Sequence, residues 1–90
     1  KGCIMVRLNR TELGRLHPGA KRFIRDLRRE NRDTHNESPA LEVIAVINGN
    51  DIWISRVERL GAFSLDNVLR DAEDHASKTG GEIYIASVAY

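Results

Sequence analysis

Cysteine and long apolar runs are scarce in this 90-residue sequence. Its single cysteine, Cys3, cannot form an intramolecular disulfide, and the four cysteines of a structural zinc site are lacking, so a reducing, cytoplasmic environment is the simpler assumption. The longest apolar run, Val43 to Ile47, is far shorter than the ~20 residues of a membrane span. The apolar stretch from Cys3 to Val6 is too short for a signal peptide. We therefore expect a single domain over residues 1–90 that makes no membrane contact.

Groupings of residues that would carry chemistry are also lacking. His17, His35 and His75 are too far apart in the chain for the short spacings of a metal site. The carboxylates beside His75 are ordinary for a solvated helix face, and Gly80-Gly81 lacks the spacing and the following lysine of a phosphate-binding loop. We expect no catalytic residues, no metal and no cofactor, and so no enzyme.

The patterns that are present predict alternating strands and helices. Asn48-Gly49-Asn50-Asp51 between two runs rich in Val and Ile is a strong hairpin signal. Thr11 is a candidate cap for a short helical turn, and Pro18 suits the first position of the helix that follows. Ser64 is a natural cap for the last helix, which Gly80-Gly81 ends. The expected elements are a strand over 2–8, a helix over 20–30, a loop over 31–40, strands over 41–47 and 52–57, a helix over 65–79 and a strand over 82–90.

This order resembles the ferredoxin-like βαββαβ arrangement, an α+β fold. The resemblance implies a four-stranded antiparallel sheet, with the first and third strands in the middle and both helices on one face. The other face would then be open and apolar. The residues expected on it are Met5, Ile44, Val46, Trp53, Tyr84 and Val88. Three occupants are conceivable: a second copy in a homodimer, another protein or chain segment, or single-stranded nucleic acid stacked on Trp53 and Tyr84.

The charges are strongly segregated along the chain. Residues 1–32 contain ten Lys and Arg against three Asp and Glu, whereas residues 33–90 contain four against ten. The basic face of the first long helix comprises Lys21, Arg22, Arg25, Arg28 and Arg29. The acidic face of the last helix comprises Asp66, Asp71, Glu73 and Asp74. Each face is a candidate surface for a partner, although side-by-side helices of opposite sign would partly neutralise one another.

Size, charge segregation and the missing catalytic groups together are similar to those of small phage-encoded inhibitors, including anti-CRISPR proteins. The resemblance implies a viral, non-catalytic regulatory or inhibitory protein that acts in the host cytoplasm by binding another macromolecule. The expected partner is a protein, for example one of a nucleic-acid-processing complex, and the expected homodimer forms through the sheet face. One alternative is a nucleic-acid-binding module that uses the basic helix over 20–30. Another is an assembly protein that homodimerises through its sheet.

Overall fold

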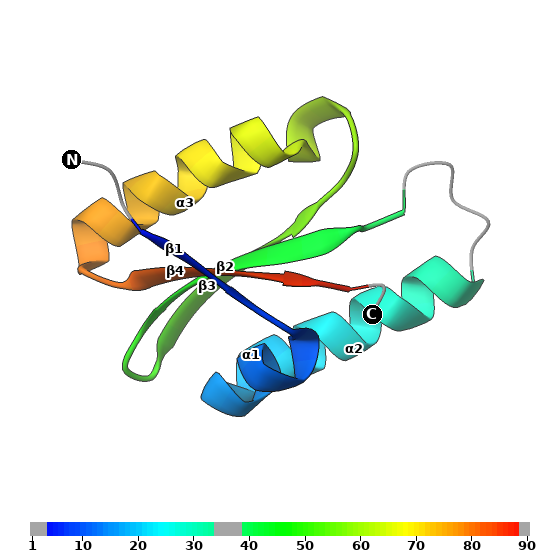
Figure 1. Ribbon diagram of the computed structural model, residues 1–90, viewed down its shortest axis with the longest axis horizontal. Helices are drawn as coiled ribbons and strands as arrows, with labels where there is room; N and C mark the ends of the chain where they lie inside the picture. The colour runs from blue at the N-terminus through cyan, green and yellow to red at the C-terminus, as the bar shows by residue number, and fades with distance from the viewer. Residues whose placement is uncertain (1–3, 34–38, 89–90) are drawn as a thin grey trace.

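The computed structural model describes residues 4–33 and 39–88, which form three α-helices, one short 3₁₀ turn and a four-stranded sheet (Figure 1). Cys3, His35 and Tyr90 lie outside the described residues. The elements in chain order are β1 (Met5–Leu8), α1 (Arg10–Leu16), α2 (Pro18–Asp33), β2 (Glu42–Asn48), β3 (Asp51–Val57), the 3₁₀ turn η1 (Gly61–Phe63), α3 (Leu65–Thr79) and β4 (Glu82–Ser87). The helix expected over 20–30 is longer at both ends, and it takes in residues 31–33 of the expected loop.

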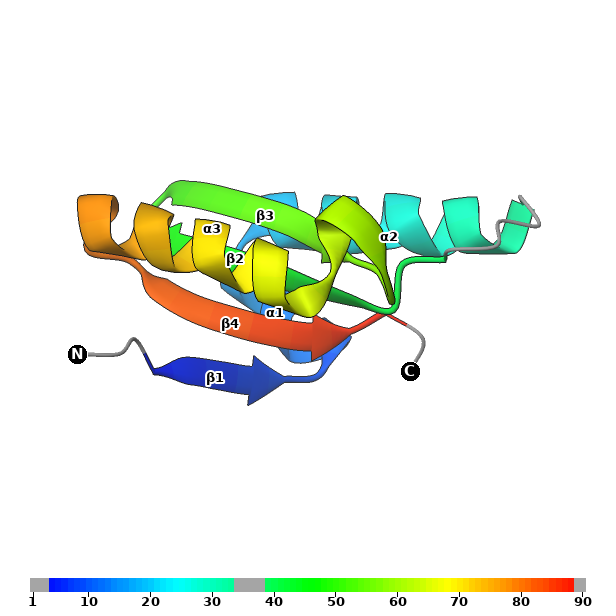
Figure 2. The same ribbon diagram turned by 90° about the horizontal axis from the view of Figure 1, so that it is seen from above.

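The sheet has the order β1-β4-β2-β3, with β2 and β4 in the middle (Figure 2). β2 is antiparallel to both β3 and β4, while β1 runs parallel to β4. The predicted hairpin is confirmed: Asn48 pairs with Asp51 across the two-residue loop Gly49-Asn50. Gly49 has a φ of 62°, and a positive φ at the first loop residue matches the twist of hairpin strands.

Helices cover both faces of this sheet, α1 and α2 on one and α3 on the other (Figure 1). The first face packs Val43 and Ala45 of β2 against Leu13 of α1 and Ile24 of α2. The second face packs Ile44 and Val46 of β2 against α3 residues. The α3 side of this second core is formed by Val68, Ala72 and Ala76. The molecule is thus a three-layer α+β structure whose sheet separates two small cores.

The ferredoxin-like expectation is wrong in three respects. The sheet is mixed rather than antiparallel, β1 and β3 lie at the edges rather than in the middle, and the two long helices lie on opposite faces. The reason lies in β2, where every residue from Val43 to Val46 is buried. A strand with apolar residues on both sides needs cover on both sides, which one helical layer cannot provide.

The open apolar sheet face expected from the sequence is therefore not present. Ile44 and Val46 are buried beneath α3, with half-buried Met5 and Trp53 packed against the same core. Tyr84 and Val88 pack on the opposite face, with α1 and α2. The hairpin part of that expectation is confirmed, since Ile44, Val46 and Trp53 do share one face of the sheet, opposite Val43 and Ala45. The error was in β4: Tyr84 and Val88 were expected on the face of Ile44 and Val46, and Ile83 and Ile85 occupy that face instead.

Candidate functional site

The most pronounced chemical feature of the surface is a basic groove between α1 and α2. It encloses about 480 Å³. The residues that line it are Arg10, Thr11, Gly14, Arg15, Lys21, Ile24, Arg25, Arg28, Arg29 and Arg32. Seven of these ten are arginine or lysine, and none is acidic. We refer to this surface as the arginine groove.

The helical period of α2 creates one wall of the arginine groove. Lys21, Arg25, Arg28 and Arg32 follow one another at intervals of four, three and four residues, which places them on one side of the helix. The buried residues of α2 turn towards the sheet beside this row. The carboxylate of Glu30 extends the other way and binds Arg56 of β3 at 3.2 Å. The four cations of this row therefore line the groove on the α1 side of α2, while Glu30 turns towards the sheet.

The other wall comes from α1, which begins at a capping box. The Asn9 side chain accepts a hydrogen bond from the Glu12 backbone N–H at 2.7 Å, and the Glu12 carboxylate accepts one from the Asn9 N–H at 2.9 Å. The cap is thus Asn9 and not Thr11, whose side chain instead lines the groove. A methyl group added at Gly14 would lie 3.3 Å from Cβ of Lys21, so glycine permits a close approach of the two helices at this point.

His17 fixes the angle between the two walls. It is the single residue between α1 and α2, and its Nδ1 accepts a hydrogen bond from the Gly19 N–H at 2.9 Å. Its Nε2 donates to the backbone carbonyl of Asn50, in the β2–β3 turn, at 2.8 Å. The junction of the helices is thereby tied to the sheet. At the other end of α2, the Asn31 side chain exchanges two hydrogen bonds with the backbone of Ala40.

Most cations of the arginine groove have no carboxylate partner within the described part of the chain. Among residues 4–33 and 39–88, no ion pair joins Arg10, Arg15, Lys21, Arg25 or Arg29 to an acidic residue. Arg28 donates to the backbone carbonyl of Val88 at 2.6 Å, and Arg32 approaches the neighbouring Asp33 at 3.9 Å in an exposed pair. Like charges crowded on one surface repel one another, and an anionic ligand relieves this repulsion.

The basic face expected from the sequence lies largely in this groove. Lys21, Arg25, Arg28 and Arg29 line it, whereas Arg22 is exposed beside it. Sequence reasoning missed the contributions of Arg10 and Arg15 from α1 and of Arg32 from the last turn of α2. One signal was present: Asn9 and Glu12 have the three-residue spacing of a capping box, which marks the start of a helix carrying Arg10 and Arg15.

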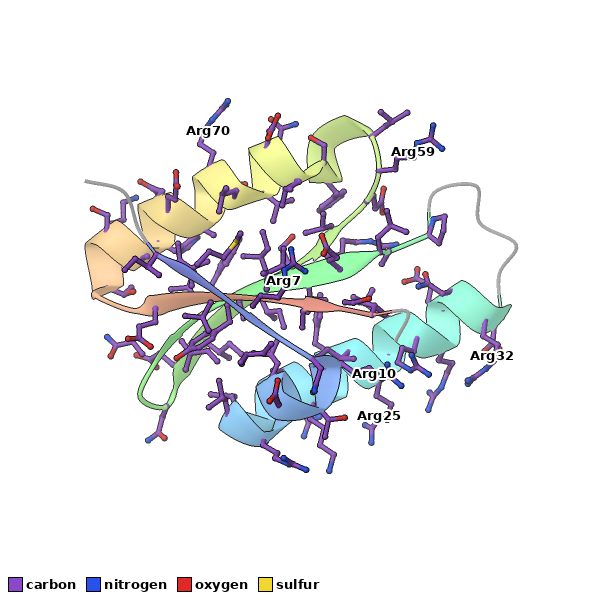
Figure 3. All side chains as sticks on the ribbon, viewed as in Figure 1. Arg7, Arg10, Arg25, Arg32, Arg59 and Arg70 are labelled. Carbon is purple, nitrogen blue, oxygen red and sulfur yellow. The ribbon has the colours of Figure 1, made fainter. Side chains whose placement is uncertain are left out.

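The acidic face lies on the far side of the sheet from the arginine groove. Asp66, Asp71, Glu73 and Asp74 are all exposed on α3. The two faces cannot neutralise each other as expected, because the sheet separates α3 from α1 and α2 (Figure 1). The acidic face also contains compensating charge, since Lys78 binds Asp74 at 3.1 Å and Arg70 extends from the same helix (Figure 3).

The expected stacking platform of Trp53 and Tyr84 is not formed. The two residues lie on opposite faces of the sheet, and each already has an intramolecular partner. Trp53 stacks on His75 of α3, with ring centroids 4.7 Å apart, and borders a shallow hollow of about 370 Å³. Tyr84 donates a hydrogen bond to the Glu82 carboxylate at 2.6 Å.

The described residues contain no group of three or more His, Cys, Asp or Glu side chains placed to hold a metal ion. None of the helices among them combines the length and the apolar character needed to cross a membrane. No protein family model, curated protein or solved structure matches this chain. Its function has to be inferred from its own side chains, of which those in the arginine groove are the most unusual.

Proposed function

We propose that this protein binds nucleic acid by its phosphate backbone and that the arginine groove is the binding surface. The observation that carries the proposal is the lining of the groove, in which the described residues include seven basic side chains and no acidic one. Neutralisation of phosphates by Lys and Arg, with release of bound counterions, is the main source of sequence-independent affinity for nucleic acid. The sequence already raised this function as an alternative.

The arrangement of the cations favours a long polyanion over a small anion. At a rise of about 1.5 Å per residue, the row from Lys21 to Arg32 extends about 16 Å along α2. Arg22 continues the positive surface outside the groove. DNA presents one charge per ~1.7 Å of its axis, so each guanidinium group of such a row finds a phosphate within reach. A small anion would meet only a few of them.

The regulatory or inhibitory role expected from the sequence stays a prediction. Its candidate phosphate mimic is the acidic face of α3, where Lys78 and Arg70 offset part of the negative charge. Homodimerisation also stays a prediction. The open sheet face that suggested it is not there, because α3 covers Ile44 and Val46. Nucleic-acid binding is favoured because the arginine groove has no such offsetting charges in its lining.

The proposal is tested with two charge-matched double variants. Arg25→Glu with Arg29→Glu reverses two cations of the groove, whereas Arg59→Glu with Arg70→Glu reverses two exposed arginines near and on α3 (Figure 3). Binding of fluorescent oligonucleotides of about two helical turns, single- and double-stranded, is measured by anisotropy against salt. We expect the wild type and the α3-side variant to bind alike, and the groove variant to lose most of its affinity.

The salt dependence provides a second readout. Within residues 4–33 and 39–88, six cations of the groove have no backbone carbonyl partner, namely Arg10, Arg15, Lys21, Arg25, Arg29 and Arg32. Contact of all six with a DNA duplex predicts a slope of about −5 in log K against log salt. The proposal is excluded if neither the single-stranded nor the double-stranded oligonucleotide binds at about 50 mM salt, or if the two double variants lose affinity equally.

A further inference from the structure

From the shape and the side chains of the arginine groove, we infer that the nucleic acid bound there is a double helix. One sugar–phosphate ridge of the duplex enters the groove, and the affinity does not depend on base sequence. The inference rests on the proposed function and specifies its ligand. It draws on three properties of the site: the position of the aromatic side chains, the chemistry of the polar ones, and the concave form of the surface.

No aromatic side chain of the described residues lies in the arginine groove. Phe23 packs against the core beneath α2. Trp53 stacks on His75 on the other side of the sheet, and Phe63 belongs to η1 near the start of α3. Tyr84 is engaged with Glu82. Proteins that bind single strands stack the exposed bases on aromatic rings placed along a basic groove. A single strand in this groove would leave its bases in water, whereas the bases of a duplex are already stacked on one another.

The polar groups of the groove match phosphates rather than base edges. Besides Thr11, every polar side chain that lines it is a cation, and none is Asn, Gln, Asp or Glu. Asn and Gln read adenine and carboxylates read cytosine, and the described lining contains none of them. Arg, Lys and Thr can also contact base edges, but only from inside the major groove. Guanidinium groups in a row bind phosphate oxygens in pairs of parallel hydrogen bonds.

The form of the surface agrees with its chemistry. Sequence is read in the major groove by a convex element, such as a helix that fits between the two phosphate strands. Here the cations line a hollow between two helices, which approach each other closely at Gly14 of α1. A concave surface accepts the convex part of a duplex, which is the sugar–phosphate ridge. One strand presents a phosphate every ~3.4 Å of the duplex axis, so a row of about 16 Å faces at most about five phosphates of one ridge.

The first test compares duplexes with their separated strands at equal salt. Probes of about two helical turns are made as DNA and as RNA, in a mixed sequence and in sequences made only of A·T(U) or G·C pairs. We expect duplexes to bind about tenfold more tightly than either strand, with similar affinity for all base compositions. DNA and RNA duplexes share the ridge, so preference for either duplex over its strands supports the inference, and the stronger of the two identifies the natural source.

The second test asks whether the ridge enters the groove. Thr11→Glu places a carboxylate between the walls, and Ser77→Glu makes the same charge change at an exposed position of α3. We expect Thr11→Glu to weaken duplex binding by about tenfold and Ser77→Glu to leave it nearly unchanged. Circular dichroism of both variants confirms that each is folded.

The outcomes separate the inference from the proposed function. Single strands that bind as tightly as duplexes, or a Thr11→Glu variant that binds like Ser77→Glu, would overturn the inference and leave nucleic-acid binding intact. A strong preference for one base composition would also overturn it. If neither single nor double strands bind, the proposed function itself fails.

Discussion

His17 connects three elements through its two ring nitrogens. Nδ1 accepts from the Gly19 N–H in the first turn of α2, which is the bond an N-cap side chain makes, and Nε2 donates to the Asn50 carbonyl. The first bond requires an unprotonated Nδ1, so the neutral ring with its proton on Nε2 is the form that fits both partners. The sequence placed His17 only in a turn before Pro18, because a histidine cap has no pattern of its own.

Replacement of His17 separates its two roles. We expect His17→Ala to lower the free energy of unfolding by about 1–2 kcal/mol, since it removes a helix cap and the bond to the hairpin turn. His17→Asn retains an oxygen that can cap α2 but does not reach Asn50, so its loss should be smaller. Urea denaturation measures both. Equal losses in the two variants would mean that the cap contributes nothing.

Tyr84 is the residue for which the structure predicts a pH effect. The hydrogen bond to Glu82 raises the pKa of the Tyr84 phenol, with burial and the nearby carboxylate charge acting in the same direction. The folded state therefore holds this proton more tightly than the unfolded chain, whose tyrosines titrate near pH 10. The resulting stabilisation is fully present below about pH 10 and is lost as the pH rises through the higher folded pKa.

Ultraviolet absorbance of tyrosinate measures this pKa directly. Tyr90→Phe leaves Tyr84 as the only tyrosine, and its titration midpoint should lie above that of the same variant unfolded in guanidinium chloride. Adding Glu82→Gln should move the midpoint back towards the unfolded value, because the charged acceptor is gone. A midpoint that does not respond to Glu82→Gln would contradict the assigned cause.

Among the elements, α3 departs most from the expectation based on sequence. The apolar stripe expected from the helical period is confirmed at Val68, Ala72 and Ala76, which are buried, but not at Leu65, which is exposed. Ser64 precedes it as expected, although its side chain makes no capping bond, and Gly80 ends it with a φ of 77°. What differs is the sheet face on which the stripe packs. The helical period shows which side of α3 is apolar. It does not show on which face of the sheet that side packs, because the same pattern fits either face.

Two isoleucines of the sheet test the position of α3. Ile44 is 0% exposed beneath this helix, whereas Ile4, just before β1, is 83% exposed. We expect Ile44→Ala to cost about 2–5 kcal/mol in the free energy of unfolding and Ile4→Ala about 0.5 kcal/mol or less. Denaturant unfolding of both gives the comparison. Similar small losses in the two would mean that α3 does not cover Ile44.

On the scale of the whole molecule, the sheet divides the charge. The arginine groove lies on the side of α1 and α2, and the acidic face of α3 lies on the other, so a net charge of only +1 conceals two strongly charged surfaces (Figure 1). Opposite charges on opposite faces are held apart by the thickness of three layers and screened by salt. A negatively charged ligand is therefore attracted to the arginine groove and repelled by the acidic face of α3.

The sequence by itself determined the features that depend on neighbours within a few residues. These are the hairpin at Gly49, the amphipathic pattern of α2 with its cation row, and the apolar stripe of α3. Only the tertiary structure decided that α3 crosses to the face opposite α2 and that β1 joins β4 in parallel at the edge. Arg10 and Arg15 became part of a site only when α1 packed beside α2. The reason is physical: periodicity is a local property, whereas the choice of sheet face depends on which apolar surfaces distant in sequence must be covered.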